Sequence, residues 1–117
     1  MLTLYGIPNC NTVKKARDWL EANDIRHVFH DFKKNGIDAA TIEHWLKQYP
    51  WEKLINRAGL TWRGLDDTTK ISITDNITAS ELMQDKTSVI KRPILVSNGK
   101  IIGLGFDENL YKETFKP

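Results

Sequence analysis

The chain has 117 residues, 40% of them hydrophobic and 27% charged, and its formal net charge at pH 7 is +2. This length and composition indicate one globular domain, and the small, dispersed charge argues against binding to nucleic acid or to an anionic membrane. No apolar run approaches the ~20 residues of a membrane helix, and residues 1–5 lack signal-peptide features. The single cysteine cannot form an internal disulfide, which fits a reducing compartment. We therefore expect a cytoplasmic protein.

The pattern of residues 1–36 predicts a strand, a helix and a second strand. Residues 2–5 are β-prone, and the breaker cluster at residues 6–9 must turn the chain. A helix is expected from about residue 11 to residue 23, because apolar residues recur there at helical spacing. Residues 25–32 have the composition of a second strand, and residues 33–36 (Lys-Lys-Asn-Gly) that of a turn.

The middle of the chain is predicted to be helical. Asp38 is placed to cap an amphipathic helix that Pro50 ends. The apolar face of this helix consists of Ile42, Trp45, Leu46 and Tyr49. Short helical pieces are expected over residues 51–77. The sequence Thr-Ala-Ser-Glu at residues 78–81 is a capping-box pattern, which predicts a helix from there to about residue 86.

The last quarter of the chain predicts two strands and a helix. Pro93 precedes an apolar run at residues 94–96, and the Asn-Gly pair at residues 98–99 predicts a hairpin turn because both residues accept positive φ. Residues 100–103 return as a fourth strand. The segment 107–115 begins with an aspartate that can cap a final helix.

The order of these elements predicts the fold class. A strand–helix–strand start gives a parallel pair with a right-handed crossover, and an Asn-Gly hairpin gives an antiparallel pair. Together they predict an α/β protein with a mixed four-stranded sheet. Among several layouts that fit, one is a single thioredoxin-like domain over residues 1–117, with a helical insertion at about residues 38–90 between its halves.

Cys10 is the main candidate for chemistry, because it follows the first predicted strand and begins the first predicted helix. The first amides of a helix lack backbone partners and carry partial positive charge, which stabilises a thiolate and lowers its pKa below about 8.5. Lys14 and Lys15, one turn further on, are expected to add to this effect.

The alternative is that Cys10 is a buried, inert side chain, which is a common fate of a lone cysteine. Polar neighbours argue against this alternative. Asn9, Asn11 and Thr12 could cap the helix or hold a bound anion. We therefore favour a reactive thiol.

Segments along the chain resemble the arsenate reductase (ArsC)/Spx family, and most closely its YffB-like branch. The first is Tyr-Gly-Ile-Pro-Asn-Cys-Asn-Thr-Val-Lys-Lys-Ala at residues 5–16. Thr-Trp-Arg at residues 61–63, Lys-Arg-Pro-Ile-Leu-Val at residues 91–96 and Gly-Leu-Gly-Phe at residues 103–106 follow in the same order. The resemblance spans nearly the whole chain and implies a thioredoxin-like fold.

The resemblance also implies roles for individual residues. In the family the cysteine, here Cys10, is the nucleophile, and the arginine of an Arg-Pro pair, here Arg92, lies beside it and binds an anion. The proline, here Pro93, is typically cis and shapes the loop that faces the thiol. Arsenate reductases of the family use a further arginine, whose counterpart is Arg57, with Arg63 as a rival.

The chain departs from the family's pattern in two places. Arsenate reductases have a third arginine near residues 103–106, where this chain has neither arginine nor lysine. Some members have Cys-x-x-Cys, but Val13 occupies the second position here, so a disulfide on Cys10 must be resolved by an external thiol. These departures disfavour arsenate reduction and favour a monothiol scheme.

We therefore expect an enzyme, a thiol oxidoreductase that reduces disulfides through Cys10 with glutathione as co-substrate and no bound cofactor. Arg92 and Arg57 would hold the carboxylates of glutathione or of another small anionic or thiol substrate, and a protein thiol is considered as a further partner. The alternatives are a Spx-like redox adaptor that binds RNA polymerase, a true arsenate reductase, and a vestigial fold with a spent thiol. No metal site is expected, because His27 and His30 point to opposite faces of a predicted strand.

Overall fold

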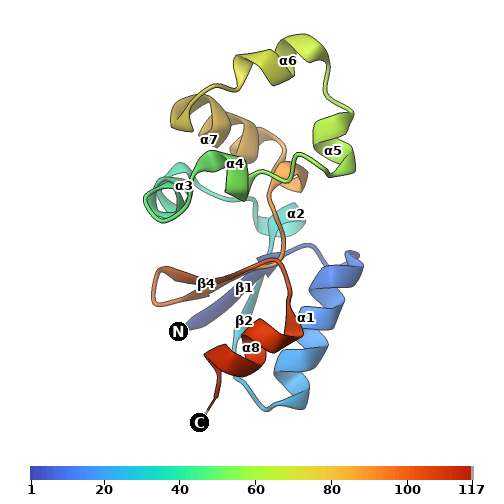
Figure 1. Ribbon diagram of the computed structural model, residues 1–117, viewed down its shortest axis with the longest axis vertical. Helices are drawn as coiled ribbons and strands as arrows, with labels where there is room; N and C mark the ends of the chain where they lie inside the picture. Colours follow the sequence, from blue (N-terminus) through green and yellow to red (C-terminus); the bar gives the residue numbers. More distant parts are fainter. Residues whose placement is uncertain (117) are drawn as a thin grey trace. The chain divides into compact units, whose positions relative to one another are not determined.

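The computed structural model describes residues 1–116, which form two compact units (Figure 1). The sheet unit consists of residues 1–35 and the chain from Arg92 onward, and the helical unit consists of Gly36–Lys91. The expected insertion at about residues 38–90 falls within the helical unit, and the assignment of residues 1–117 to a single domain stays a prediction.

The sheet unit contains four strands in the spatial order β2-β1-β3-β4. The strands are β1 (Leu2–Gly6), β2 (Val28–Asp31), β3 (Ile94–Ser97) and β4 (Lys100–Leu104). β1 is parallel to β2 and antiparallel to β3, and β3 is antiparallel to β4. The predicted mixed four-stranded sheet is therefore confirmed.

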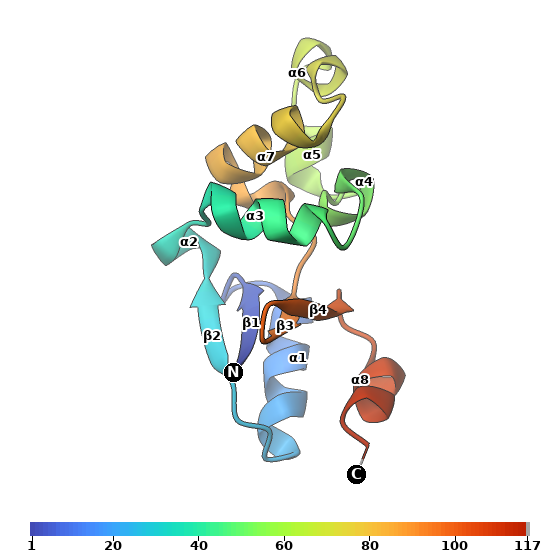
Figure 2. The same ribbon diagram turned by 90° about the vertical axis from the view of Figure 1, so that its left-hand side faces the viewer.

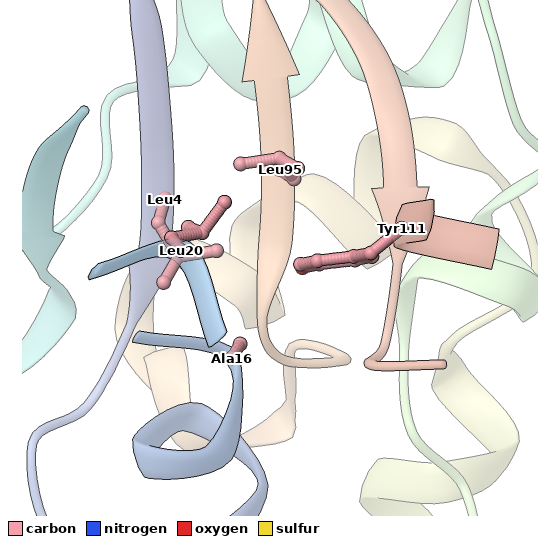
Figure 3. Close-up of a cluster of buried hydrophobic side chains, with 5 residues drawn as sticks. All are labelled: Leu4, Ala16, Leu20, Leu95 and Tyr111. Atoms are coloured by element: carbon pink, nitrogen blue, oxygen red, sulfur yellow. The ribbon is translucent and has the colours of Figure 1, made fainter. Parts of the chain in front are cut away.

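Two helices, α1 (Asn11–Ala22) and α8 (Glu108–Thr114), pack on one face of this sheet. Leu4 of β1 and Leu95 of β3 are register partners, and both are fully buried among side chains of the two helices. Figure 3 shows the cluster that they form, which consists of Leu4, Ala16, Leu20, Leu95 and Tyr111. This apolar contact fixes the axis of α1 on the sheet.

The hairpin between β3 and β4 turns as the Asn-Gly pair predicts. Asn98 and Gly99 have φ of 50° and 84°, values that asparagine tolerates and that glycine adopts without penalty. The register shifts by one residue between Leu95 and Val96, which marks a β-bulge in the hairpin.

The second strand is shorter than expected. β2 begins three residues after residue 25, so His27 lies before the strand rather than in it. After Asp31 the chain enters a single helical turn, α2 (Phe32–Asn35). The Asp31 Oδ1 accepts a hydrogen bond from the Lys33 amide at 2.9 Å, and this side-chain contact ends the strand in favour of the helical turn.

The helical unit contains five short helices and one 3₁₀ turn. They are α3 (Ala39–Leu46), α4 (Trp51–Leu54), α5 (Leu60–Arg63), α6 (Asp67–Ser72), α7 (Asn76–Asp85) and η1 (Thr87–Val89). Asp38 caps α3 as predicted, because its Oδ1 accepts a hydrogen bond from the Thr41 amide at 2.8 Å. The short helical pieces expected over residues 51–77 are present.

The capping box of α7 lies three residues earlier than the sequence predicted. Asp75, not Thr78, is the N-cap residue. The Asp75 Oδ1 accepts a hydrogen bond from the Thr78 amide at 2.8 Å, and the Asp75 amide donates to the Thr78 Oγ1 at 3.2 Å. A charged carboxylate is the better acceptor at a helix N-terminus, so it takes the cap and leaves threonine the reciprocal role.

Tyr111 offers a test of this packing. Its hydroxyl is buried and has no hydrogen-bond partner among residues 1–116, while its ring packs edge-on against Trp19 and Phe106. Because an unpaired buried hydroxyl costs about 1–3 kcal/mol, Tyr111→Phe should leave the free energy of unfolding in urea unchanged or raise it. Tyr111→Ala should lower it by about 3–5 kcal/mol. A Tyr111→Phe variant that lost more than about 1 kcal/mol would contradict this account.

Candidate active site around Cys10

Cys10 occupies the N-cap position of α1, directly after the turn that follows β1. Its backbone is extended, and its carbonyl accepts the first helical hydrogen bond, from the Lys14 amide at 2.9 Å. Its own amide donates to the Ile7 carbonyl at 3.4 Å, which closes the turn. The half-buried thiol therefore lies at the end of a helix whose first amides have no helical partner.

β1 and the first turn of α1 approach each other closely at Gly6. A Cβ atom on Gly6 would lie 2.8 Å from the Cγ2 of Val13, whose side chain is fully buried. In the sequence Gly6 is recognisable only as part of a chain breaker, and this contact with Val13 has no local signal. The missing side chain lets α1 begin against the sheet and so sets the position of Cys10.

Three groups lower the pKa of Cys10 against the effect of burial. Burial, the largest single influence, raises it, but the Val13 amide, the Arg92 side chain and the Thr12 amide together bring it below its ordinary value. The Cys10 side chain makes no capping hydrogen bond to the start of α1. The Val13 and Thr12 amides nevertheless lower the pKa, because they stabilise the negative charge of the thiolate. No acidic residue lies in the first turn of α1 to oppose that charge.

Arg92 reaches this site from the segment that leads into β3. The Arg92–Pro93 peptide bond is cis, which is the conformation that the family resemblance implies. The Pro93 carbonyl accepts a hydrogen bond from the Gly105 amide at 2.8 Å, and Gly105 has a φ of 83° that favours glycine. This bond ties the segment before β3 to the chain just after β4. Arg92 is thus positioned by two adjacent strands.

The structure brings together some of the predicted site residues. Arg92 and the amide of Thr12 act on Cys10 directly. Asn9 and Asn11 precede and follow Cys10 in the chain, and both are exposed. Cys10 itself is the N-cap residue of α1, so neither these two asparagines nor Thr12 caps the helix. Their role in anion binding stays a prediction.

The expectation that Lys14 and Lys15 help to lower the pKa of Cys10 was wrong. The groups that lower this pKa are two amides and a guanidinium, and neither lysine is among them. Both lysine side chains are exposed, where water and salt screen their charge.

Arg57 and Arg63 both belong to the helical unit and both are exposed. The Arg57 guanidinium lies over the ring of Trp51, 5.7 Å from its centroid. The Arg63 carbonyl accepts a hydrogen bond from the Lys70 Nζ at 3.2 Å. The choice between these two arginines as a second anion-binding residue stays a prediction.

Residues 1–116 contain no group of three His, Cys, Asp or Glu side chains that could hold a metal ion. None of the helices formed by these residues has the length and apolar character needed to cross a lipid bilayer.

A mixed four-stranded sheet with two helices on one face and a thiol at the start of the first helix defines a thioredoxin-like thiol protein. The ArsC family model matches residues 5–114, and the chain belongs to the ArsC family.

Comparison with individual proteins agrees with this assignment. The solved structure of a protein named YFFB has a TM-score of 0.90 and 40% identity, over 97% of both chains. An arsenate reductase (ArsC) related protein from Brucella melitensis has a TM-score of 0.77 and 47% identity, over 99% of this chain and 95% of that one. The global transcriptional regulator Spx of Streptococcus pneumoniae is 27% identical over 93% of this chain and 81% of its own. The relatives therefore include both reductase-related proteins and a regulator.

The contact between Gly6 and Val13 can be tested by exchanging volume across it. Gly6→Ala places a methyl group within 2.8 Å of Val13, so it should lower the free energy of unfolding by about 1–3 kcal/mol and slow the alkylation of Cys10. Val13→Ala alone should also lower the free energy of unfolding, because it leaves a cavity beside Gly6. The double variant should lose less than the sum of the two single variants, because the methyl group added at position 6 then occupies part of that cavity. Additive losses in the double variant would show that the two positions do not interact.

The effect of Arg92 on the thiol can be measured from the pH dependence of alkylation by iodoacetamide. Because Arg92 lowers the pKa of Cys10, Arg92→Ala should raise that pKa and move the midpoint of the rate profile to higher pH. Below the midpoint the rate should fall, because a smaller fraction of Cys10 is then thiolate. Arg92→Lys should have a smaller effect, and Lys100→Ala, at the far end of the hairpin, should have none. An unchanged midpoint in Arg92→Ala would contradict the assigned role.

Proposed function

We propose that this protein is a glutathione-dependent thiol–disulfide reductase in which Cys10 is the only nucleophile. The observation that supports this most is the lowered pKa of Cys10, caused by two helix amides and Arg92 despite the opposing effect of burial. A thiol with a lowered pKa is a thiolate for a larger fraction of the time near neutral pH, and the thiolate is the attacking species.

The reaction proceeds in two exchanges. The Cys10 thiolate attacks one sulfur of a substrate disulfide; a new disulfide forms on Cys10, and the second substrate sulfur leaves as a thiolate that takes up a proton from water. A glutathione thiolate then attacks the disulfide on Cys10 and releases the Cys10 thiolate. When the substrate is a glutathione mixed disulfide attacked at its glutathione sulfur, the products are the reduced substrate thiol and oxidised glutathione.

Arg92 has two roles in this scheme. Its charge favours the Cys10 thiolate before attack. The same guanidinium offers paired donors to a carboxylate of the glutathione moiety, for which arginine geometry is well suited. We also propose that Arg57, or its rival Arg63, is a second arginine that binds the anionic substrate.

Two other functions follow from the relatives. Arsenate reduction is disfavoured because residues 103–106 supply neither arginine nor lysine for the oxyanion. A regulatory role like that of the Spx relative is the second candidate, with the 27% identity to Spx as its support. The single cysteine gives this chain no internal disulfide switch for such a role.

The decisive experiment is reduction of a glutathione mixed disulfide, coupled to glutathione reductase, in the wild type and in Cys10→Ser. We expect turnover in the wild type and at least about a thousandfold loss in Cys10→Ser, because the hydroxyl is a far weaker nucleophile at neutral pH. Serine is close to cysteine in size, so the free energy of unfolding should change little.

Arsenate is tested in the same assay. Turnover of arsenate by the wild type would replace the proposal with an arsenate reductase. No turnover of either substrate by a folded protein with an alkylatable Cys10 would overturn it in favour of the regulatory role.

A further inference from the structure

One edge of the sheet unit brings three separate segments together. The parallel strands β1 and β2 end at the same edge, and β3, antiparallel to β1, begins there. Figure 2 shows β1 and β2 running in the same direction, with α2 directly after β2. We call this the Cys10 edge and define it as residues 7–15, 31–35 and 92–93.

The Cys10 edge is strongly cationic. Its four lysines are exposed, and Arg92 is half-buried. The five cationic residues are Lys14, Lys15, Lys33, Lys34 and Arg92. The one carboxylate is that of Asp31, which accepts hydrogen bonds from two backbone amides at 2.9 and 3.4 Å.

The rest of the sheet unit does not share this excess of positive charge. Over residues 1–6, 16–30 and 94–116, six carboxylate side chains accompany five lysines and arginines. The formal charge of +2 for the whole chain conceals this polarity. The positive potential of the unit is therefore concentrated where the thiol lies.

The cations of this edge are too many and too spread out for one small anion. Adjacent strands lie about 4.8 Å apart, and Lys14 and Lys15 lie on α1 four and five residues after Cys10. Lys33 and Lys34 lie in α2, which follows β2, the strand that pairs with β1. Glutathione has two carboxylates and one ammonium group and cannot pair with all of them. A polypeptide with carboxylates on both sides of its disulfide can.

We propose that the disulfide attacked by Cys10 is carried by an acidic polypeptide segment, and that Lys14, Lys15, Lys33 and Lys34 select it. This inference rests on the proposed function, because it names the substrate class of the same thiol. The lysines act on the approach of the substrate, since the reactivity of the sulfur is set by Arg92 and the amides of α1. Their effect is long-range and sensitive to salt.

The test measures a single exchange. Two peptides differ only in having Glu or Gln on both sides of a cysteine, and each is activated as a mixed disulfide with 2-thiopyridine. The Cys10 thiolate attacks the peptide sulfur, the Cys10–peptide disulfide forms, and 2-thiopyridine leaves as a thiolate that is protonated to the coloured thione. The second-order rate constant is followed by absorbance at low and at high salt.

At low salt the second-order rate constant of the wild type should be at least about tenfold higher with the Glu peptide than with the Gln peptide. At about 1 M salt the ratio should approach one, because the Debye length is then about 3 Å. K14E/K15E and K33E/K34E should each abolish or reverse the preference at low salt. Their rates with the Gln peptide should stay within about twofold of the wild type.

The matched control is R26E/K100E. These two exposed cations lie at the opposite edge of the sheet, before β2 and at the start of β4, and their reversal changes the net charge by the same amount. We expect this variant to keep most of the preference for the Glu peptide. A wild-type ratio near one at low salt, or an equal loss in R26E/K100E, would overturn the proposal.

This experiment separates the two proposals. A single exchange needs no glutathione, so a preference for the Glu peptide without glutathione-coupled turnover would support the acidic substrate while the glutathione scheme fails. Turnover with glutathione and no preference between the peptides would support the glutathione scheme and overturn the acidic substrate.

Discussion

The interaction on which the rest of the site depends is that between the Cys10 sulfur and the unpaired amides at the start of α1, with Arg92 beside it. A negative sulfur in this place replaces the hydrogen-bond partner that a helix N-terminus lacks. Three contacts hold the backbone around this pair in place. The turn bond to Ile7 holds the backbone of Cys10, the close approach at Gly6 holds the helix, and the bond from Gly105 to Pro93 holds the segment that carries the arginine.

Two kinds of electrostatic effect operate at this site, and they have different ranges. Dipoles of backbone amides and a half-buried guanidinium act on the sulfur over contact distances, where salt has little influence. Exposed lysines act over longer distances, and their influence falls with ionic strength. A change in the first kind alters the intrinsic reactivity of the thiol, whereas a change in the second alters which molecules reach it. The groups that set the reactivity of the thiol and the lysines that attract the substrate are different residues, so a substitution in one group can leave the other effect unchanged.

Most of the fold could be predicted from residue patterns, but several details of the site could not. The strands, the Asn-Gly hairpin and the apolar stripe of α1 follow from local periodicity and turn chemistry, and the structure confirms them. The errors in β2 and α7 arise where an aspartate side chain competes for a backbone amide, which periodicity does not reveal. Gly6 against Val13 is a tertiary contact with no local signal. The pairing of Arg92 with Cys10 came from the family resemblance, since the residues alone would have indicated a surface charge.

The burial of Val13 has a consequence for how redox chemistry can evolve on this scaffold. Position 13 is where the dithiol members of the family have their second cysteine, and in this chain its side chain is fully enclosed, on the side of α1 that faces Gly6. A cysteine there would be smaller than valine and would lie one helical turn from Cys10, hidden from thiols in solution. The outer sulfur would then always be the one that meets the substrate, and the inner one would serve only to release it. With Val13→Cys the chain would release its substrate by forming an internal disulfide, and an external thiol would then be needed to reduce that disulfide rather than to free the substrate.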